Sequence, residues 1–96
     1  MTPDFHPAAQ QELTAAVKNG EERAIGLGLE LLQESRRVVG MLCVSPDIGK
    51  PLSGMYRRFP LRRFPFSIVY RIDGDRLHII AVAHRRRRPG YWRQRR

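Results

Sequence analysis

The sequence predicts a single α+β domain in which two consecutive helices pack on an antiparallel sheet. Its 96 residues leave no room for a second domain at the usual size of roughly 100–200 residues. Hydrophobic residues recur with a helical period in the first half of the chain and with period two in the second half. Helices and strands that are segregated along a chain are typical of α+β architectures.

The first helix is expected to follow a short strand around Asp4 to His6. Pro7 suits the first helical position, because the N–H that proline lacks would be unpaired there. The apolar residues that follow it at helical spacing are Ala9, Leu13, Ala16 and Val17. Asn19-Gly20 is a turn signal, so the pattern predicts that this helix ends there.

A second helix is predicted from about Glu21 to Leu42. Glu21 and Glu22 favour a helix start, since negative charge complements the positive end of the helix dipole. The expected packing stripe consists of Ile25, Gly28, Leu29, Leu32, Ser35, Val39 and Leu42. Gly28 allows another backbone to approach closely. The very short connection between the helices predicts an antiparallel hairpin.

The second half predicts a meander of about three strands after a proline- and glycine-rich loop, Ser45 to Gly54. The next segment, Arg57 to Arg63, mixes arginines with Phe59 and Leu61, but Pro60 argues against a regular central strand. Period-two alternation then predicts a strand from Phe66 to Ile72.

A hairpin turn at Asp73-Gly74-Asp75 leads to the last strand, Arg76 to His84. This strand is apolar on both faces, which places it inside the sheet. Strict alternation puts Leu77, Ile79, Ala81 and Ala83 on one face. The helical hairpin is expected to cover one face of the sheet, leaving the other face partly open and lined by arginines.

The charge is distributed unevenly. Eighteen basic and nine acidic side chains give a net charge of +9. Residues 1–56 contribute 5 − 7 = −2 and residues 57–96 contribute 13 − 2 = +11. Four adjacent arginines, Arg85 to Arg88, open a basic C-terminal segment, residues 85–96. Adjacent like charges repel one another unless an anionic partner offsets them, so an anionic partner is favoured.

Several classes of protein are disfavoured. The longest apolar run, residues 79–83, is far shorter than the roughly 20 residues that span a bilayer. Residues 1–9 lack the layout of a signal peptide. Cys43 is the single cysteine, so no internal disulfide forms, and a cytoplasmic location is expected. The histidines and Cys43 show no paired ligand spacing, so no metal or other cofactor is expected.

Three segments resemble the RelE/ParE superfamily of bacterial type II toxins. They are FHPAA (residues 5–9), LRRFPFSIVYR (61–71) and AVAHRRRRPGYW (81–92). Their order and spacing are similar to those of the ParE-like branch, also called plasmid stabilisation proteins. The resemblance implies a growth-inhibiting toxin that a cognate acidic antitoxin neutralises, with operator DNA bound only through the antitoxin.

The resemblance leaves two targets open, since RelE-type toxins cut messenger RNA on the ribosome without a metal, whereas ParE-type toxins inhibit DNA gyrase. By position, Arg85 and Tyr91 match a pair that contributes to RelE-type cleavage. Ser67 stands where RelE-type toxins carry a basic residue, which weakens the nuclease interpretation. No glutamate follows Glu34, so a glutamate base on the sheet is excluded. His84 is then the one plausible titratable acid or base.

Gyrase binding is therefore the favoured interpretation, with mRNA cleavage as the alternative and a non-toxic nucleic-acid-binding module third. The candidate contacts to the target or to nucleic acid are Arg62, Arg63, Arg85, Arg86, Arg87, Arg88 and Trp92. Each candidate also has a structural interpretation. Tyr91 and Trp92 would pack the C-terminal segment on the sheet, and His84 would be a hydrogen-bonded strand end. Arg62 and Arg63 would point to opposite faces of a regular strand, so one of them would be a solvated surface charge.

Overall fold

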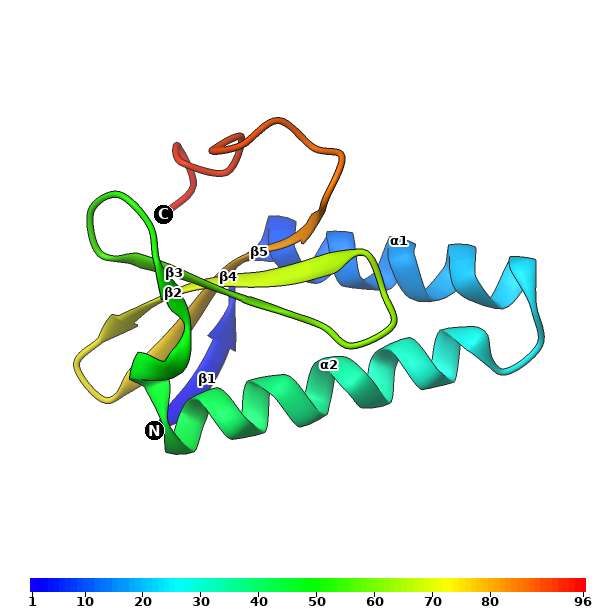
Figure 1. Cartoon of the computed structure of the whole chain (residues 1–96), viewed down its shortest axis with the longest axis horizontal. Helices are drawn as coiled ribbons and strands as arrows, with labels where there is room; N and C mark the ends of the chain where they lie inside the picture. The colour runs from blue at the N-terminus through cyan, green and yellow to red at the C-terminus, as the bar shows by residue number, and fades with distance from the viewer.

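The computed structural model describes residues 1–96 and has two helices packed on a five-stranded sheet (Figure 1). The elements are β1 (Thr2–Phe5), α1 (Pro7–Arg23), α2 (Leu27–Val44), a 3-10 helix η1 (Pro46–Ile48), β2 (Lys50–Pro51), β3 (Tyr56–Pro60), β4 (Phe66–Asp73) and β5 (Arg76–His84). The strand order is β1-β5-β4-β3-β2, with β1 parallel to β5 and the other pairs antiparallel. The predicted α+β class, helical hairpin and β3-β4-β5 meander are confirmed. Neither helix has the long apolar stretch that crossing a bilayer requires.

The predicted end of α1 at Asn19-Gly20 is wrong, because the helix continues to Arg23. Gly20 is buried inside the helix, and a Cβ on it would lie 3.4 Å from the backbone nitrogen of Gly28. Its small size therefore serves helix packing. The turn comes later, at Gly26, whose φ of 88° lies in the left-handed region that glycine adopts readily.

The second helix is shifted by several residues from the predicted range of about 21–42 to Leu27–Val44. Ile25 then falls in the connecting turn and is 99% exposed, and Leu29 faces solvent. Leu31 and Val38 are buried in their place, beside the correctly predicted Gly28, Ser35, Val39 and Leu42. Glu21 lies in α1, and its carboxylate accepts hydrogen bonds from two backbone N–H groups at the start of α2, those of Gly26 (2.9 Å) and Gly28 (3.1 Å).

Pro60 is compatible with a strand that is not central, as expected. It is the last residue of β3, and β3 lies next to the edge of the sheet, where β2 has only two residues. Proline is tolerated at strand ends and near sheet edges because few ladder hydrogen bonds are lost there. The short strand β2 was not predicted at all.

A β-bulge changes the predicted faces of β5. Val69 pairs with Ala81 and Tyr70 pairs with Ile79, which leaves Ile80 as an extra residue. Leu77, Ile79 and Val82 pack with the helices, whereas Ile80 and Ala81 belong to a second cluster. Strict alternation therefore fails after Ile79, because a bulge inserts one unpaired residue and reverses the side-chain order beyond it.

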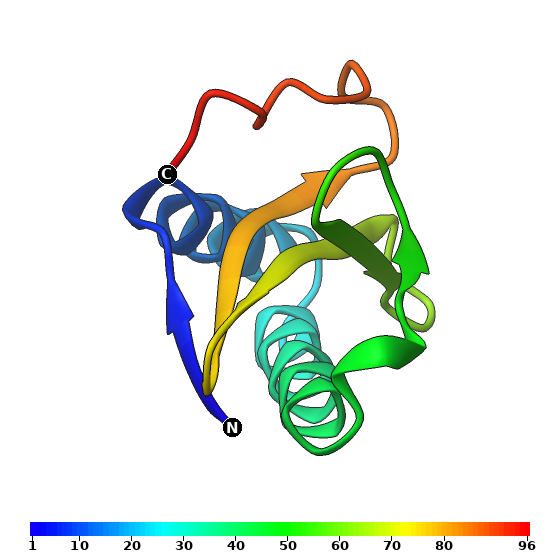
Figure 2. The same ribbon diagram turned by 90° about the vertical axis from the view of Figure 1, so that its left-hand side faces the viewer.

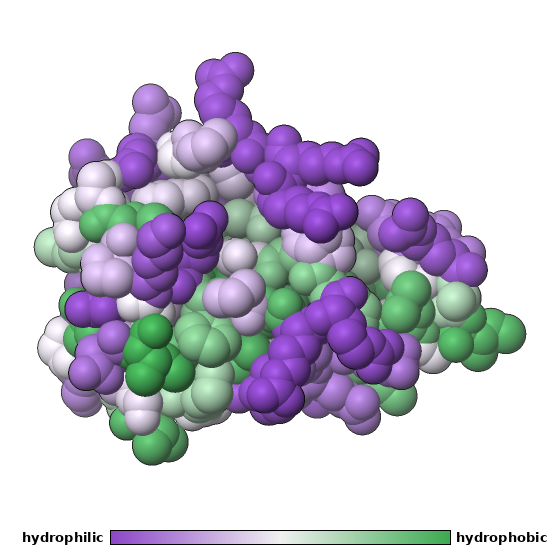
Figure 3. Space-filling model, viewed as in Figure 1, coloured by the Kyte–Doolittle hydropathy of each residue, from purple (hydrophilic) through white to green (hydrophobic).

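The C-terminal segment covers part of the sheet face opposite the helices, in agreement with the expectation of a partly open face (Figure 2). Trp92 is buried there against Val69, Ile80 and Ala81. Burial of this large side chain explains why β5 is apolar on both faces. Hydrophilic side chains form the outer surface above this segment, whereas apolar surface appears at the tip of the helical hairpin (Figure 3).

Candidate functional site

A hollow of about 200 Å³ lies on the sheet face opposite the helices, between the sheet and the C-terminal segment. Its floor includes Ser67 and Val69 of β4 and Ala83 of β5. Five arginines line it: Arg58, Arg85, Arg87, Arg88 and Arg93. We refer to this site as the arginine hollow.

The arginine hollow is strongly cationic. No acidic residue lines it, and none of its five arginines forms an ion pair within the chain. Guanidinium groups bind carboxylate or phosphate oxygens in pairs through their planar fork. Like charges gathered in one place repel one another, so an anionic ligand would stabilise this arrangement.

Aromatic side chains hold the C-terminal segment in place. The guanidinium of Arg87 lies 3.9 Å from the centre of the Tyr91 ring, and that of Arg93 lies 4.9 Å from the Trp92 ring. Trp92 packs edge-on against Tyr56, with ring centres 4.8 Å apart. The prediction that Tyr91 and Trp92 pack this segment on the sheet is confirmed.

The hydroxyl of Tyr91 is directed at α1. It donates a 2.6 Å hydrogen bond to Oε2 of Glu12. Burial and this carboxylate raise the pKa of Tyr91 well above its ordinary value. The hydroxyl is therefore held protonated and committed to Glu12, so Tyr91 contributes to the arginine hollow mainly through its ring.

Glu12 is a residue that sequence reasoning missed. Its carboxylate also accepts hydrogen bonds from Arg95, at 2.8 and 3.0 Å, and from the backbone N–H of Val82, at 3.0 Å. Burial acts to raise the pKa of Glu12, but the hydrogen bonds from Arg95, Tyr91 and Val82 together hold it below its ordinary value. The sequence analysis considered only glutamates on the sheet, whereas Glu12 lies on α1 and its side chain reaches β5.

The Glu12 contacts predict a pH-dependent attachment of the C-terminal segment. The pKa of Glu12 is lower in the folded chain than its ordinary value of 4.5. The stabilisation that its carboxylate gives the folded state is therefore complete above pH 4.5 and is lost as the pH falls through the lowered pKa. The emission of Trp92, the single tryptophan, should shift to longer wavelength on acidification from about pH 6 to about pH 3 as the segment detaches. In Glu12→Gln the uncharged amide should weaken the attachment already at neutral pH. A wild-type and variant emission profile that coincide at every pH would contradict this role for Glu12.

His84 lies at the end of β5, as expected for a hydrogen-bonded strand-end residue. Its Nδ1 accepts the backbone N–H of Arg86 at 3.1 Å, and its ring packs edge-on against Phe66. The same ring borders the arginine hollow. His84 is thus the one histidine that lines the arginine hollow.

The remaining predicted residues lie apart from the arginine hollow. Arg62 and Arg63 occupy the loop after β3, so they do not alternate as in a strand. The backbone N–H of Arg62 donates to Glu34 at 2.7 Å, and the Arg63 side chain lies 3.6 Å from Glu30. Arg86 does not line the hollow.

Two further arginines of the hollow, Arg58 and Arg93, were not predicted. Arg58 lies two residues after Tyr56 in β3, so both side chains are on the same face of the sheet. This period-two spacing is the signal in the sequence that could have identified Arg58. Ser67, which stands at the sequence position where RelE-type toxins carry a basic residue, lines the hollow. Arg58 from the neighbouring strand supplies positive charge to the same place.

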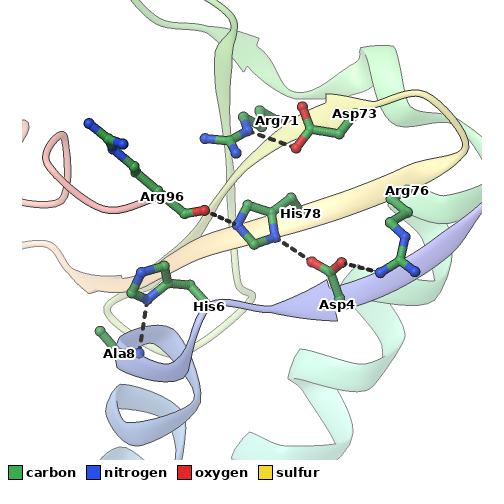
Figure 4. A network of polar contacts seen from close by, with 8 residues as sticks. All are labelled: Asp4, His6, Ala8, Arg71, Asp73, Arg76, His78 and Arg96. Atoms are coloured by element: carbon green, nitrogen blue, oxygen red, sulfur yellow. Dashed lines mark hydrogen bonds and ion pairs between the residues drawn. The ribbon is translucent and has the colours of Figure 1, made fainter.

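A second polar network fixes the end of the chain near β1 (Figure 4). Asp4 accepts hydrogen bonds from Arg76, at 2.9 Å, and from Nδ1 of His78. The other ring nitrogen of His78 lies 3.2 Å from the carbonyl of Arg96. The hydrogen bonds from His78 and Arg76 lower the pKa of Asp4. The C-terminal segment is therefore attached to β5 at both Ile80 and His78, and to α1 at Glu12.

The family of the chain is decided by residues 4–89, which match the model described as the ParE toxin of the type II toxin-antitoxin system parDE. The chain belongs to the ParE toxin family. A solved structure titled "Chromosomal ParDE TA system from P. aeruginosa" has a similar fold, with a TM-score of 0.76 and 22% sequence identity. The match covers 88% of this chain and 95% of that one. No curated protein sequence matches the chain.

The ParE assignment confirms the resemblance noted in the sequence. The arginine hollow of this ParE family member draws on two of the three resembling segments, since Ser67 belongs to the central one and Arg85, Arg87 and Arg88 belong to the C-terminal one. The family model describes a toxin of a type II toxin-antitoxin system, parDE.

Proposed function

We propose that this ParE family member inhibits growth by binding DNA gyrase and is neutralised by a cognate acidic antitoxin. The observation that carries the proposal is the arginine hollow, with five arginines that have no acidic partner within the chain. Metal-free RNA cleavage is helped by a base or acid that can exchange a proton with the reacting group. The Tyr91 hydroxyl is hydrogen-bonded to Glu12 and is not free for this role, which favours a binding surface over a catalytic site.

Ribosome-dependent mRNA cleavage is the second candidate. It is favoured by one observation, that Arg85, His84 and Tyr91 all border the same hollow. In this alternative, arginines would stabilise the charge that develops on phosphate, and His84 would transfer a proton. A non-toxic nucleic-acid-binding module has no comparable support, because the family is a toxin family.

Controlled expression in bacteria separates the two candidates. Induction of the chain alone should arrest growth, and coexpression with the antitoxin encoded beside it should restore growth. Under the gyrase proposal, plasmids from arrested cells become relaxed while ribosome-bound mRNA stays intact. Cleaved mRNA that becomes intact again in Arg85→Ala would favour the nuclease candidate. Unimpaired growth at high expression would contradict both.

Association with the antitoxin should depend on salt. We expect the antitoxin to carry carboxylates to the unpaired arginines, and charge complementarity accelerates encounter at low ionic strength. Raising salt from about 50 mM to about 500 mM shortens the Debye length severalfold and should slow association at least about tenfold. Stopped-flow fluorescence of Trp92 would measure the rate. A rate that is independent of salt would contradict the electrostatic part of the proposal.

A further inference from the structure

Strand β5 is paired on both sides along its first half only. β1 ends at Phe5, which pairs with Ile79, and the chain then turns into α1. From Ile80 to His84, β5 pairs with β4 on one side and has no strand on the other. An unpaired strand edge is a template for pairing with another chain unless the protein covers it.

Two side chains occupy this edge in the place of a neighbouring strand. The N–H of Val82 donates to Oε1 of Glu12 at 3.0 Å, and the carbonyl of Ile80 accepts from Nη1 of Arg95 at 3.0 Å. A carboxylate oxygen thus replaces a strand carbonyl, and a guanidinium N–H replaces a strand amide. Because backbone groups alternate along a strand, the N–H of His84 points to the same edge.

A cleft of about 250 Å³ runs beside this edge. Its lining includes Glu12, Ala15, Ala16 and Asn19 of α1, together with Phe66 and Tyr91. We refer to it as the edge cleft. Ala15 and Ala16 have short side chains, so the part of the α1 wall beyond Glu12 lets a backbone approach β5 closely.

The edge cleft continues into a larger hollow of about 500 Å³, which shares Ala16, Asn19, Phe66 and His84 with it. The larger hollow is lined by Leu27 and Leu31 of α2, by the last turns of α1 and by the loop before β4. The path is therefore mainly apolar at this end, although Glu22 and Arg23 also line it. At the other end it meets Arg87 and the arginines that follow β5 directly.

We infer that the edge cleft is the docking site for an extended segment of the antitoxin, which adds a strand beside Ile80–His84. This inference rests on the proposed function. Added strands bind through main-chain hydrogen bonds and gain specificity from alternate side chains. Apolar side chains of the segment would contact Ala16 and Phe66, and acidic ones would pair with Arg87, which has no ion pair within the chain. That charge complementarity favours an acidic segment over a second copy of this basic chain.

The incoming strand would replace both side chains on the edge. Its carbonyl would accept the Val82 N–H, and its N–H would donate to the Ile80 carbonyl. Glu12 and Arg95 form two hydrogen bonds with each other, so both charges stay paired after they leave the edge. The exchange therefore leaves no buried charge without a partner, which would otherwise be strongly unfavourable.

Ala15→Arg tests the inference, because an arginine at this exposed cleft position fills the path of the added strand. Its matched control is Thr14→Arg, which adds the same charge at an exposed position of the same helix outside the cleft. The cognate antitoxin should bind Ala15→Arg at least about tenfold more weakly than wild type by calorimetry, and Thr14→Arg within about twofold. Equal affinities for the two variants would overturn the inference.

Amide hydrogen exchange supplies an independent readout on the unmodified complex. Exchange of the Val82 and His84 amides should slow when the antitoxin binds, because strand hydrogen bonds protect them. Antitoxin binding without slower exchange at these amides would place the contact elsewhere and overturn the inference while leaving the proposed function intact. Failure of the antitoxin to bind the wild-type chain would contradict both. A dimer of the free chain that buries this edge would overturn the choice of occupant.

Discussion

Gly28→Ala should destabilise the protein by about 1–3 kcal/mol, the usual cost of overpacking a tight contact. A Cβ on Gly28 would lie 2.5 Å from the carbonyl oxygen of Val17 and 3.1 Å from the Glu21 carboxylate. The two helices would have to separate, and the hydrogen bond from the Gly28 N–H to Glu21 would lengthen. Thermal unfolding should occur roughly 5–20 °C lower, given about 4–8 °C per kcal/mol for a domain of this size.

The same substitution elsewhere in α2 provides the control. Gly40 is exposed, and a Cβ there would meet no atom within 4 Å. Gly40→Ala should therefore stabilise the protein by about 0.5–1 kcal/mol, because alanine loses less backbone entropy than glycine in a helix. Equal effects of the two substitutions in calorimetry would show that the helices do not depend on this close contact.

Removing two charges from the arginine hollow should abolish target binding at concentrations where the wild type is saturated. Arg58→Ala combined with Arg88→Ala is the most informative change, because both side chains are exposed and form no hydrogen bond or ion pair within the chain. At about 1.5–3 kcal/mol for each hydrogen bond to a charged group, the double variant should bind gyrase more than about a hundredfold more weakly. Biolayer interferometry with purified gyrase would measure the affinity.

A charge-matched variant separates the arginine hollow from net charge. Arg36→Ala combined with Lys50→Ala removes the same charge from exposed positions of α2 and β2 that do not line the hollow. It should bind within about threefold of the wild type, since exposed charges beyond the Debye length contribute little. If both double variants lost affinity equally, the basic character of the chain as a whole would explain binding and the hollow would have no special role.

Sequence patterns predicted the order of the elements because burial imposes a period on each of them. They failed at single residues whose role is set by the packing of the whole domain. Ile80 forms a bulge that no turn residue marks, so the predicted faces of β5 are wrong beyond it. Gly20 was interpreted as a helix end, yet it serves as a small residue at a helix contact. In both cases a tertiary contact overrides a local signal.

Only part of the candidate site was predicted, because the rest of it depends on contacts between residues that are far apart in the sequence. Arg85, Arg87 and Arg88 follow a strand directly, so their place was evident from the chain order. Glu12 lies 70 residues from Val82 in the sequence, and no pattern links an exposed-looking helical glutamate to the last strand. Such pairings become visible only when the packing of α1 on β5 is known.

The most direct test of the proposed function is the supercoiling of relaxed plasmid by purified gyrase in the presence of the chain. The proposal predicts inhibition by the wild type, retention of inhibition in Arg36→Ala with Lys50→Ala, and loss of inhibition in Arg58→Ala with Arg88→Ala. Uninhibited supercoiling at a concentration of the wild type that arrests translation and cleaves ribosome-bound mRNA would contradict it.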